Sequence, residues 1–91
     1  MPDGGDPPPD AYGQAARCLE IVVAALREAG AGPEHVVRTR TYLVDAADWE
    51  EVGRAHGERF GDVRPASTMV VVTGFLDPRW RVEMEADAIV D

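Results

Sequence analysis

The clearest pattern in this sequence is a helical repeat of apolar side chains within residues 11–29. They recur every three or four positions, at Tyr12, Ala15, Leu19, Val22, Val23 and Leu26. Asp10 stands where an N-cap is needed, and Gly30 stands where a left-handed C-terminal cap is needed. We therefore predict a helix over residues 11–29 with Gln14 on its polar, outward face.

Residues 36–44 (VVRTRTYLV) have the two-residue alternation and the β-branched side chains of a strand. One face of the predicted strand carries Val37, Thr39, Thr41 and Leu43. The other face carries Arg38, Arg40, Tyr42 and Val44. The two sets of side chains are expected to point to opposite sides of a sheet.

A second helix is predicted over residues 46–60, capped by Asp45 or Asp48. Its stripe is formed by Trp49, Val52, His56 and Phe60. Residues 68–73 (TMVVVT) and 80–90 (WRVEMEADAIV) then predict two strands separated by an Asp-Pro turn. The order α-β-α-β-β indicates an α+β protein with one right-handed strand–helix–strand unit.

The acidic, proline-rich residues 1–9 predict a disordered lead, and residues 10–91 predict a single domain. The 91 residues carry a formal net charge of −8, and all nine bases are arginine, so a catalytic lysine is excluded. Such an acidic surface repels a phosphate backbone, which disfavours nucleic acid as a partner. No apolar run reaches the ~20 residues needed to span a bilayer, so we expect a cytoplasmic protein with no membrane partner.

The sequence gives little support for a metal site or for a catalytic nucleophile. His35 and His56 lack any His-x-x-x-His spacing, and the single Cys18 cannot complete a cysteine-rich metal site. Cys18 falls in the middle of the first predicted helix, away from the helix N-terminus that would activate a thiol. We therefore expect no metal and no cofactor, a structural role for Cys18, and a partly packed His56.

One group of charged residues is more suggestive. Carboxylates on one face of the last predicted strand and guanidiniums on one face of the first would meet if these strands pair. The residues are Glu83, Glu85, Asp87, Arg38 and Arg40. The pattern is compatible with cross-strand ion pairs on a solvated sheet face. It is also compatible with a polar cleft in which an arginine binds a substrate carboxylate and a glutamate orients water.

Several short motifs, taken in order, carry a family resemblance. They are QAARCLEI (14–21), EAGA (28–31) leading into HVVRT (35–39), YLVD (42–45), FG (60–61), RPAST (64–68) and VEMEA (82–86). Together these motifs resemble the RidA/YjgF family of reactive-intermediate deaminases, also called endoribonuclease L-PSP. The resemblance covers residues 10–90, nearly the whole chain.

The resemblance implies a chorismate-mutase-like fold with two helices on one face of a mixed sheet. It also implies a homotrimer with ligand clefts between subunits, and hydrolysis of reactive 2-imino acids to 2-oxo acids without a metal or organic cofactor. Glu85 matches the family's water-orienting carboxylate. The candidate substrate-binding residues are Arg64, Met69, Gly53 and Arg38.

The sequence departs from the family at several positions. Ser67 stands where the family's deaminases carry the arginine that binds the substrate carboxylate, and serine cannot form that bidentate charge pair. Met69 and Gly53 replace a small residue, often cysteine, and an asparagine. The two or three N-terminal strands of the family are also expected to be missing, through a shortened sequence or natural trimming.

Three functions follow from these observations. The first is an imine deaminase that depends on Glu85, an activity that Ser67 in place of the arginine would weaken or remove. The second is a non-catalytic trimeric module that binds a small ligand or a partner on the same fold. The third is a ribonuclease, which the older family name suggests and which the net charge of −8 disfavours.

Overall fold

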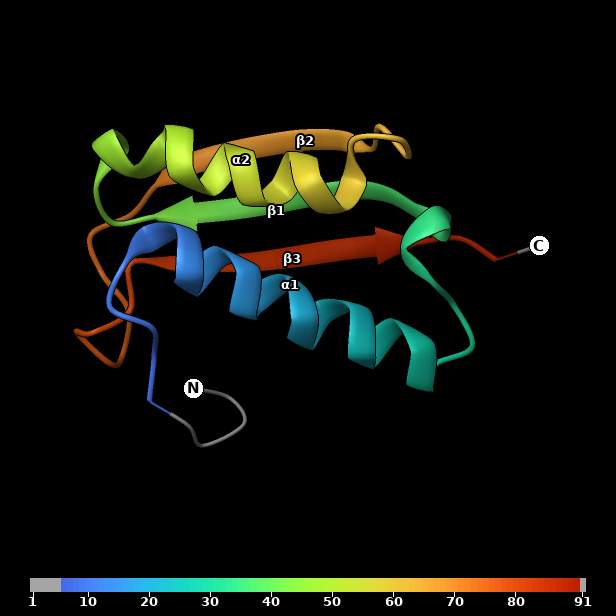
Figure 1. Cartoon of the computed structure of the whole chain (residues 1–91), viewed down its shortest axis with the longest axis horizontal. Coiled ribbons are helices and arrows are strands. Elements are labelled where there is room, and N and C mark those ends of the chain that lie inside the picture. Colours follow the sequence, from blue (N-terminus) through green and yellow to red (C-terminus); the bar gives the residue numbers. More distant parts are fainter. Residues whose placement is uncertain (1–5, 91) are drawn as a thin grey trace.

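In the computed structural model, which describes residues 6–90, two helices cover one face of a three-stranded sheet (Figure 1). The elements are α1 (Ala11–Glu28), β1 (Val36–Leu43), α2 (Trp49–Phe60), β2 (Ala66–Val71) and β3 (Val82–Ala88). Short 3-10 turns at Pro33–His35 and Ala46–Asp48 precede β1 and α2. The predicted α+β class and element order are therefore confirmed.

The sheet order is β2-β1-β3, so β1 lies at its centre (Figure 1). β1 pairs in parallel with β2 across the α2 connection, and antiparallel with β3. Within residues 6–90, the far edges of β2 and β3 have no strand partner. The mixed sheet with two helices on one face agrees with the architecture that the family resemblance implied.

The core lies between the helices and the covered face of the sheet. Its buried members are Ala11, Ala15 and Leu19 from α1, Val52, Ala55 and Phe60 from α2, and Val36, Leu43 and Val82 from the sheet. Thr39 and Thr41 are buried on the same face of β1. The predicted alternation of β1 therefore places Thr39, Thr41 and Leu43 inward.

The first residues of β1 depart from that alternation. Val37 was predicted to share a face with Thr39, Thr41 and Leu43, but it is 45% exposed, and Val36 takes the buried position instead. The cause is an irregularity in the β1–β3 pairing, where the register shifts between Val36 and Arg38. A bulge of this kind inserts one residue and reverses the direction of the side chains before it.

Gln14 was expected on the polar face of α1, and this prediction was wrong. Its side chain is only 1% exposed and connects three segments of backbone. The amide nitrogen donates to the carbonyls of Pro8 at 2.9 Å and Arg79 at 3.0 Å. The amide oxygen accepts from the N–H of Arg81 at 2.7 Å. Gln14 thus ties the start of α1 to the chain that enters β3.

The helix ends were predicted more accurately. Asp10 accepts a hydrogen bond from the N–H of Gly13, and Gly30 adopts a φ of +88°, the left-handed conformation expected after α1. Asp45 caps the 3-10 turn by accepting from the N–H of Ala47 at 2.9 Å. Asp48 occupies the N-cap position of α2 but makes no capping bond.

The inward stripe of α2 begins later than predicted. Trp49 is 58% exposed, whereas Val52, Ala55 and Phe60 are buried. Trp49 is the first residue of α2, directly after the 3-10 turn, so it precedes the part of the helix that lies on the sheet. The stripe predicted from the sequence was right for Val52 and Phe60 and wrong for Trp49.

Residues 1–5 lie outside the described residues, so the disordered lead over residues 1–9 stays a prediction, as do the domain limits. Within residues 6–90, the helices are too short or too polar to cross a membrane. Pro8 and Asp6 contact Gln14 and Arg79, respectively. The last residues of the lead therefore lie against the N-terminal end of α1 and the approach to β3.

Candidate functional site

The face of the sheet that the helices leave uncovered carries the predicted charged group. In the antiparallel register, Arg38 lies opposite Asp87 and Arg40 lies opposite Glu85. Both pairs form ion pairs, so the prediction that these carboxylates and guanidiniums meet on one surface is confirmed. Tyr42 lies opposite Glu83 at the next position on this face.

The Arg38–Asp87 pair has the geometry of a surface ion pair. Both Nε and Nη2 of Arg38 donate to the same oxygen of Asp87, at 3.0 Å and 2.8 Å. Both side chains are more than half exposed, at 51% and 60%. Water screens such a pair, and its contribution to the free energy of folding is about 0.2–1 kcal/mol.

Glu85 is held differently. The hydroxyl of Tyr42 donates a hydrogen bond to one carboxylate oxygen of Glu85. Nη1 of Arg40 lies 3.8 Å from the other oxygen, and the carboxylate stays open to solvent. The pKa of Arg40 is raised above its usual range, mainly by its hydrogen bond with the Tyr42 side chain and secondly by the negative charge of Glu85. The result is an oriented, water-accessible carboxylate beside a permanent cation, which is an arrangement suited to activating water.

Ser67 and Met69 lie on the other face of the sheet. In the parallel register, Ser67 pairs with Thr39 and Met69 pairs with Thr41. Thr39 and Thr41 point toward the helices, and paired residues of neighbouring strands point the same way. Glu85 points away from the helices. Within one chain, the structure therefore does not bring Glu85 together with Ser67 or Met69.

The remaining candidates are also apart from Glu85. Gly53 lies within α2, with open space where a Cβ would stand. Arg64 lies in the exposed turn before β2 and adopts a φ of +55°, which is unusual for a residue other than glycine. Arg38 is the only one of the proposed substrate-binding residues that shares a sheet face with Glu85.

His56 is a packed residue, as predicted. Its Nε2 lies 2.8 Å from the hydroxyl oxygen of Thr39, and its ring packs 5.1 Å from that of Phe60. Burial lowers the pKa of His56, because the imidazolium loses its hydration. Among residues 6–90, no three His, Cys, Asp or Glu side chains are grouped to hold a metal ion. The predicted absence of a metal or cofactor stays a prediction.

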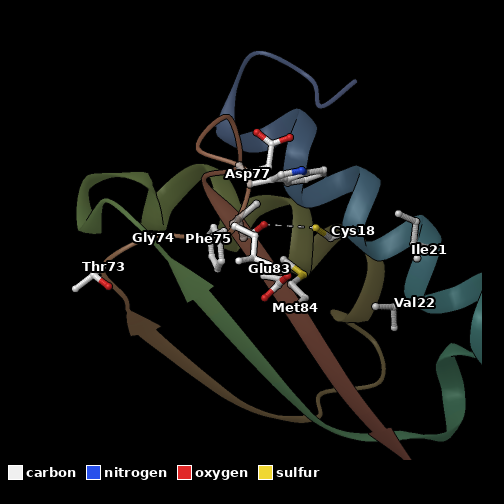
Figure 2. Close-up of a pocket in the computed structure, with 12 residues that line it drawn as sticks. Cys18, Ile21, Val22, Thr73, Gly74, Phe75, Asp77, Glu83 and Met84 are labelled. Carbon is white, nitrogen blue, oxygen red and sulfur yellow. Dashed lines mark hydrogen bonds between the residues drawn. The ribbon is translucent and has the colours of Figure 1, made fainter. Parts of the chain in front are cut away.

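A mainly apolar pocket lies away from the ion pairs of the polar face. It has a volume of about 960 Å³ and runs between α1 and the free edge of β3 (Figure 2). Cys18, Ile21 and Val22 form its α1 wall, and Phe75, Leu76, Trp80, Val82 and Met84 form much of the remainder. Most of these side chains are apolar, and the two charged residues of the lining, Asp77 and Glu83, are both carboxylates. The pocket therefore has no guanidinium to bind a substrate carboxylate.

Cys18 lies in this pocket without being a reactive thiol. Its Sγ donates a weak hydrogen bond to the carbonyl of Val82 at 3.8 Å (Figure 2). Burial, and then the charge of Glu83, raises the pKa of Cys18 to about 11. The thiolate is therefore scarce at neutral pH, as expected for a structural cysteine.

Sequence reasoning missed two features of the sites. The contact between Tyr42 and Glu85 could have been found, because the alternation of β1 places Tyr42 on the face of Arg38 and Arg40. The ion pair of Arg81 with the buried Asp48 links the residue just before β3 to the turn before α2, at 2.8 Å and 3.1 Å. Nothing in the sequence pattern indicates that pair, because its members are 33 residues apart.

Comparison with known proteins gives a consistent picture. The sequence matches the endoribonuclease L-PSP family over residues 2–90. It is 44% identical over 79 residues to an uncharacterized protein of Streptomyces coelicolor, covering 87% of this chain and 59% of that protein. The crystal structure of Rv2704 from Mycobacterium tuberculosis, a member of the YjgF/YER057c/UK114 family, matches with a TM-score of 0.90 and 43% identity. That match covers 91% of this chain and 70% of Rv2704.

The fold and the sequence match define the class: an α+β protein of the YjgF type. The chain belongs to the RidA/YjgF family, whose older name is endoribonuclease L-PSP. It spans less than two thirds of the length of the Streptomyces relative. The fold is also shared with Escherichia coli TdcF, crystallised with bound serine, at a TM-score of 0.90 and 23% identity over 100% of this chain and 73% of TdcF.

Proposed function

We propose that this chain hydrolyses small 2-imino acids to 2-oxo acids and ammonia, as a homotrimer with its sites between subunits. The observation that carries the proposal is the environment of Glu85. This carboxylate is fixed by the Tyr42 hydroxyl, is accessible to water, and lies beside the guanidinium of Arg40. It lies opposite Arg40, on the face of the sheet away from the buried Thr39 and Thr41. Both helices cover the other face (Figure 1).

The chemistry needs two charged groups. A guanidinium binds the substrate carboxylate, and Glu85 accepts a proton from the water that attacks the imine carbon. Glu85 then returns this proton to the nitrogen, and the resulting carbinolamine loses ammonia and leaves the 2-oxo acid. One water is consumed for each ammonia released. Neither step needs a metal or a redox cofactor.

Assembly is part of the proposal because of where the candidate residues lie. Ser67 and Glu85 are on opposite faces of the sheet in one chain, so they could share a site only across a subunit contact. All six residues of β2 are exposed, among them the apolar Met69, Val70 and Val71. Burial of this strand in a trimer would remove that apolar surface from water.

A non-catalytic module that binds small ligands is the second candidate. Ser67 favours it, because a serine cannot supply the bidentate contact of the family's deaminase arginine. The binding of serine by TdcF supports an amino acid or a related small acid as the ligand. In this case, Glu85 and Arg40 would bind and orient the ligand without hydrolysing it.

The test is an assay of the purified chain with freshly generated 2-iminopropanoate, with light scattering to measure the assembly. We expect faster hydrolysis than in buffer, complete loss of that excess in Glu85→Gln, and an increase in Ser67→Arg. Asp87→Asn is the matched control, since it removes a carboxylate from the same strand and face. Binding of 2-oxobutyrate without hydrolysis would establish the second candidate. A monodisperse monomer at micromolar concentration would contradict the trimer.

A further inference from the structure

Arg38 and Arg40 both project from the uncovered face of the sheet, but their partners differ. Nε and Nη2 of Arg38 donate to Asp87 at 3.0 Å and 2.8 Å. Nη1 of Arg40 lies 3.8 Å from the nearest oxygen of Glu85, whereas a charge-assisted hydrogen bond is about 2.7–2.9 Å long. Asp87 therefore already occupies Arg38, while the charge of Arg40 is only partly satisfied.

The surroundings of Arg40 leave donors of its guanidinium available. β1 is the central strand, so Arg40 has a described strand on each side, with Glu85 of β3 and Thr68 of β2 as its neighbours. Thr68 is uncharged and exposed, and the side chain of Arg40 is itself 37% exposed. The side chains of Tyr42 and Glu85 are partners of only some of the five N–H donors of Arg40. The remaining donors can bind a ligand.

The position of Arg40 next to Glu85 fits the shape of a 2-imino acid. In such an acid, the carboxylate carbon is bonded directly to the imine carbon. Arg40 and Glu85 lie opposite each other in the register, and the Tyr42 hydroxyl holds Glu85. A carboxylate bound to Arg40 would therefore bring the imine carbon to the water that Glu85 orients. At Arg38, the same carboxylate would have to compete with Asp87.

The surface around these groups is slightly hollowed. The hollow is lined by Arg38, Arg40, Glu85, Ala86 and Asp87. Its charged side chains are between 37% and 60% exposed. A small acid can reach the guanidinium of Arg40 there, and a second subunit would be needed to close the site over it.

We propose, on the basis of the function proposed above with its site at Glu85, that Arg40 is the specificity-determining residue of this site. Its guanidinium binds the free carboxylate of a small 2-imino or 2-oxo acid in a bidentate manner, and analogues without that charge are bound weakly. Arg38 has no such role, because its donors are held by Asp87.

The experiment compares two ligands that differ only in charge, 2-oxobutyrate and its uncharged amide, 2-oxobutanamide. Titration calorimetry measures the affinity of the full chain for each. The variants are Arg40→Gln, Arg40→Lys and Arg38→Gln. Arg27→Gln is the matched control, since it removes the same charge from the last turn of α1, away from the sheet face. Light scattering and circular dichroism check the assembly and the fold of each variant.

We expect the wild-type chain and Arg27→Gln to bind the acid at least about tenfold more tightly than the amide, from charge-assisted hydrogen bonds. Arg40→Gln should bind both ligands equally, and Arg38→Gln should keep the preference for the acid. Arg40→Lys should be intermediate, because an ammonium keeps the charge but not the planar fork. A role of Arg40 in the fold alone would weaken the binding of both ligands together.

A direct measurement uses the wild-type chain and so does not depend on the folding of a variant. In NMR spectra, 2-oxobutyrate should shift the Nε–Hε resonance of Arg40 more than that of Arg38, and the amide should shift neither. Neither ligand is hydrolysed, so a chain that shows these effects without imine hydrolysis would contradict the deaminase and support the role of Arg40.

Three results would overturn the role of Arg40. The first is equal affinity of the wild-type chain for the acid and the amide. The second is a full preference for the acid in Arg40→Gln, or an equal loss of that preference in Arg27→Gln. The third is a resonance of Arg40 that 2-oxobutyrate leaves unchanged at saturation.

Discussion

The two faces of the central strand β1 have opposite chemistry. On the covered face, Thr39, Thr41 and Leu43 are almost completely excluded from water, beneath α1 and α2. On the uncovered face, Arg38 and Arg40 take part in ion pairs that remain open to solvent. This strand of eight residues therefore contributes both to the buried core and to the exposed polar face, because successive side chains point in opposite directions.

This difference indicates where stability and function can be changed independently. Burial of apolar side chains provides most of the free energy of folding, whereas exposed ion pairs contribute little. Substitutions on the covered face should therefore change the free energy of unfolding. Substitutions on the uncovered face should change ligand binding and hydrolysis while the fold is retained. The predictions below test that separation, from the largest expected effect to the smallest.

Phe60→Ala should have the largest effect on the free energy of unfolding. Phe60 is 1% exposed at the end of α2, so truncation to alanine leaves a cavity in the core. We expect a loss of about 3–5 kcal/mol, which is comparable to the whole stability of a small domain. Urea unfolding followed by circular dichroism measures it, with Tyr42→Phe on the uncovered face as the control. A loss below about 1 kcal/mol would show that Phe60 is not a core residue.

Gln14→Ala should have the next largest effect. The substitution removes hydrogen-bond partners from the carbonyls of Pro8 and Arg79 and from the N–H of Arg81. Leaving buried backbone groups unpaired costs about 1–3 kcal/mol. Glu20→Ala, on the exposed side of the same helix, is the matched control. Equal urea midpoints for the two variants would show that water replaces Gln14 without loss.

The regular elements of this fold could be predicted because each has a clear period. Residues 11–29 repeat at the helical interval, and residues 36–44 alternate, so helix and strand follow from local pattern alone. The bulge near Val37, the burial of Gln14 and the exposure of Trp49 depend on contacts with distant segments. No local period contains that information.

The candidate site was predictable to a similar degree. The pairing of Arg38 and Arg40 with carboxylates of β3 followed from the alternation of two strands, and the structure confirms it. The direction of Ser67 did not follow, because the strand was predicted over residues 68–73 (TMVVVT), after Ser67, whereas β2 spans Ala66–Val71. The three consecutive valines of that run also do not distinguish two faces. The direction of Ser67 is set by the parallel register with β1, which pairs Ser67 with the buried Thr39.

Double-mutant cycles should distinguish a guanidinium–carboxylate pair with a buried carboxylate from an exposed pair. Arg81 donates to both oxygens of Asp48, and Asp48 is only 7% exposed. We expect a coupling energy of about 1–3 kcal/mol there, against about 0.2–1 kcal/mol for the exposed Arg38–Asp87 pair. Added salt should weaken the exposed pair more. Equal coupling energies, with equal salt dependence, would contradict the difference in burial.

The smallest expected effect is the pH dependence of the free energy of unfolding that comes from His56. This residue of α2 contacts Thr39 on the covered face of the sheet. Its pKa is lower in the folded chain than the ordinary value of 6.5, because burial disfavours the imidazolium. The unfolded chain therefore binds more protons near this pH, so acid favours unfolding. The contribution of the neutral His56 to the free energy of unfolding is fully present above about pH 6.5. It is lost as the pH falls from there through the pKa that His56 has in the folded chain. In His56→Gln, which can keep a hydrogen bond to Thr39, this loss should disappear. Urea unfolding of both proteins from pH 7.5 to pH 5 measures it, and parallel curves would show that His56 ionises as freely in the folded chain as in the unfolded one.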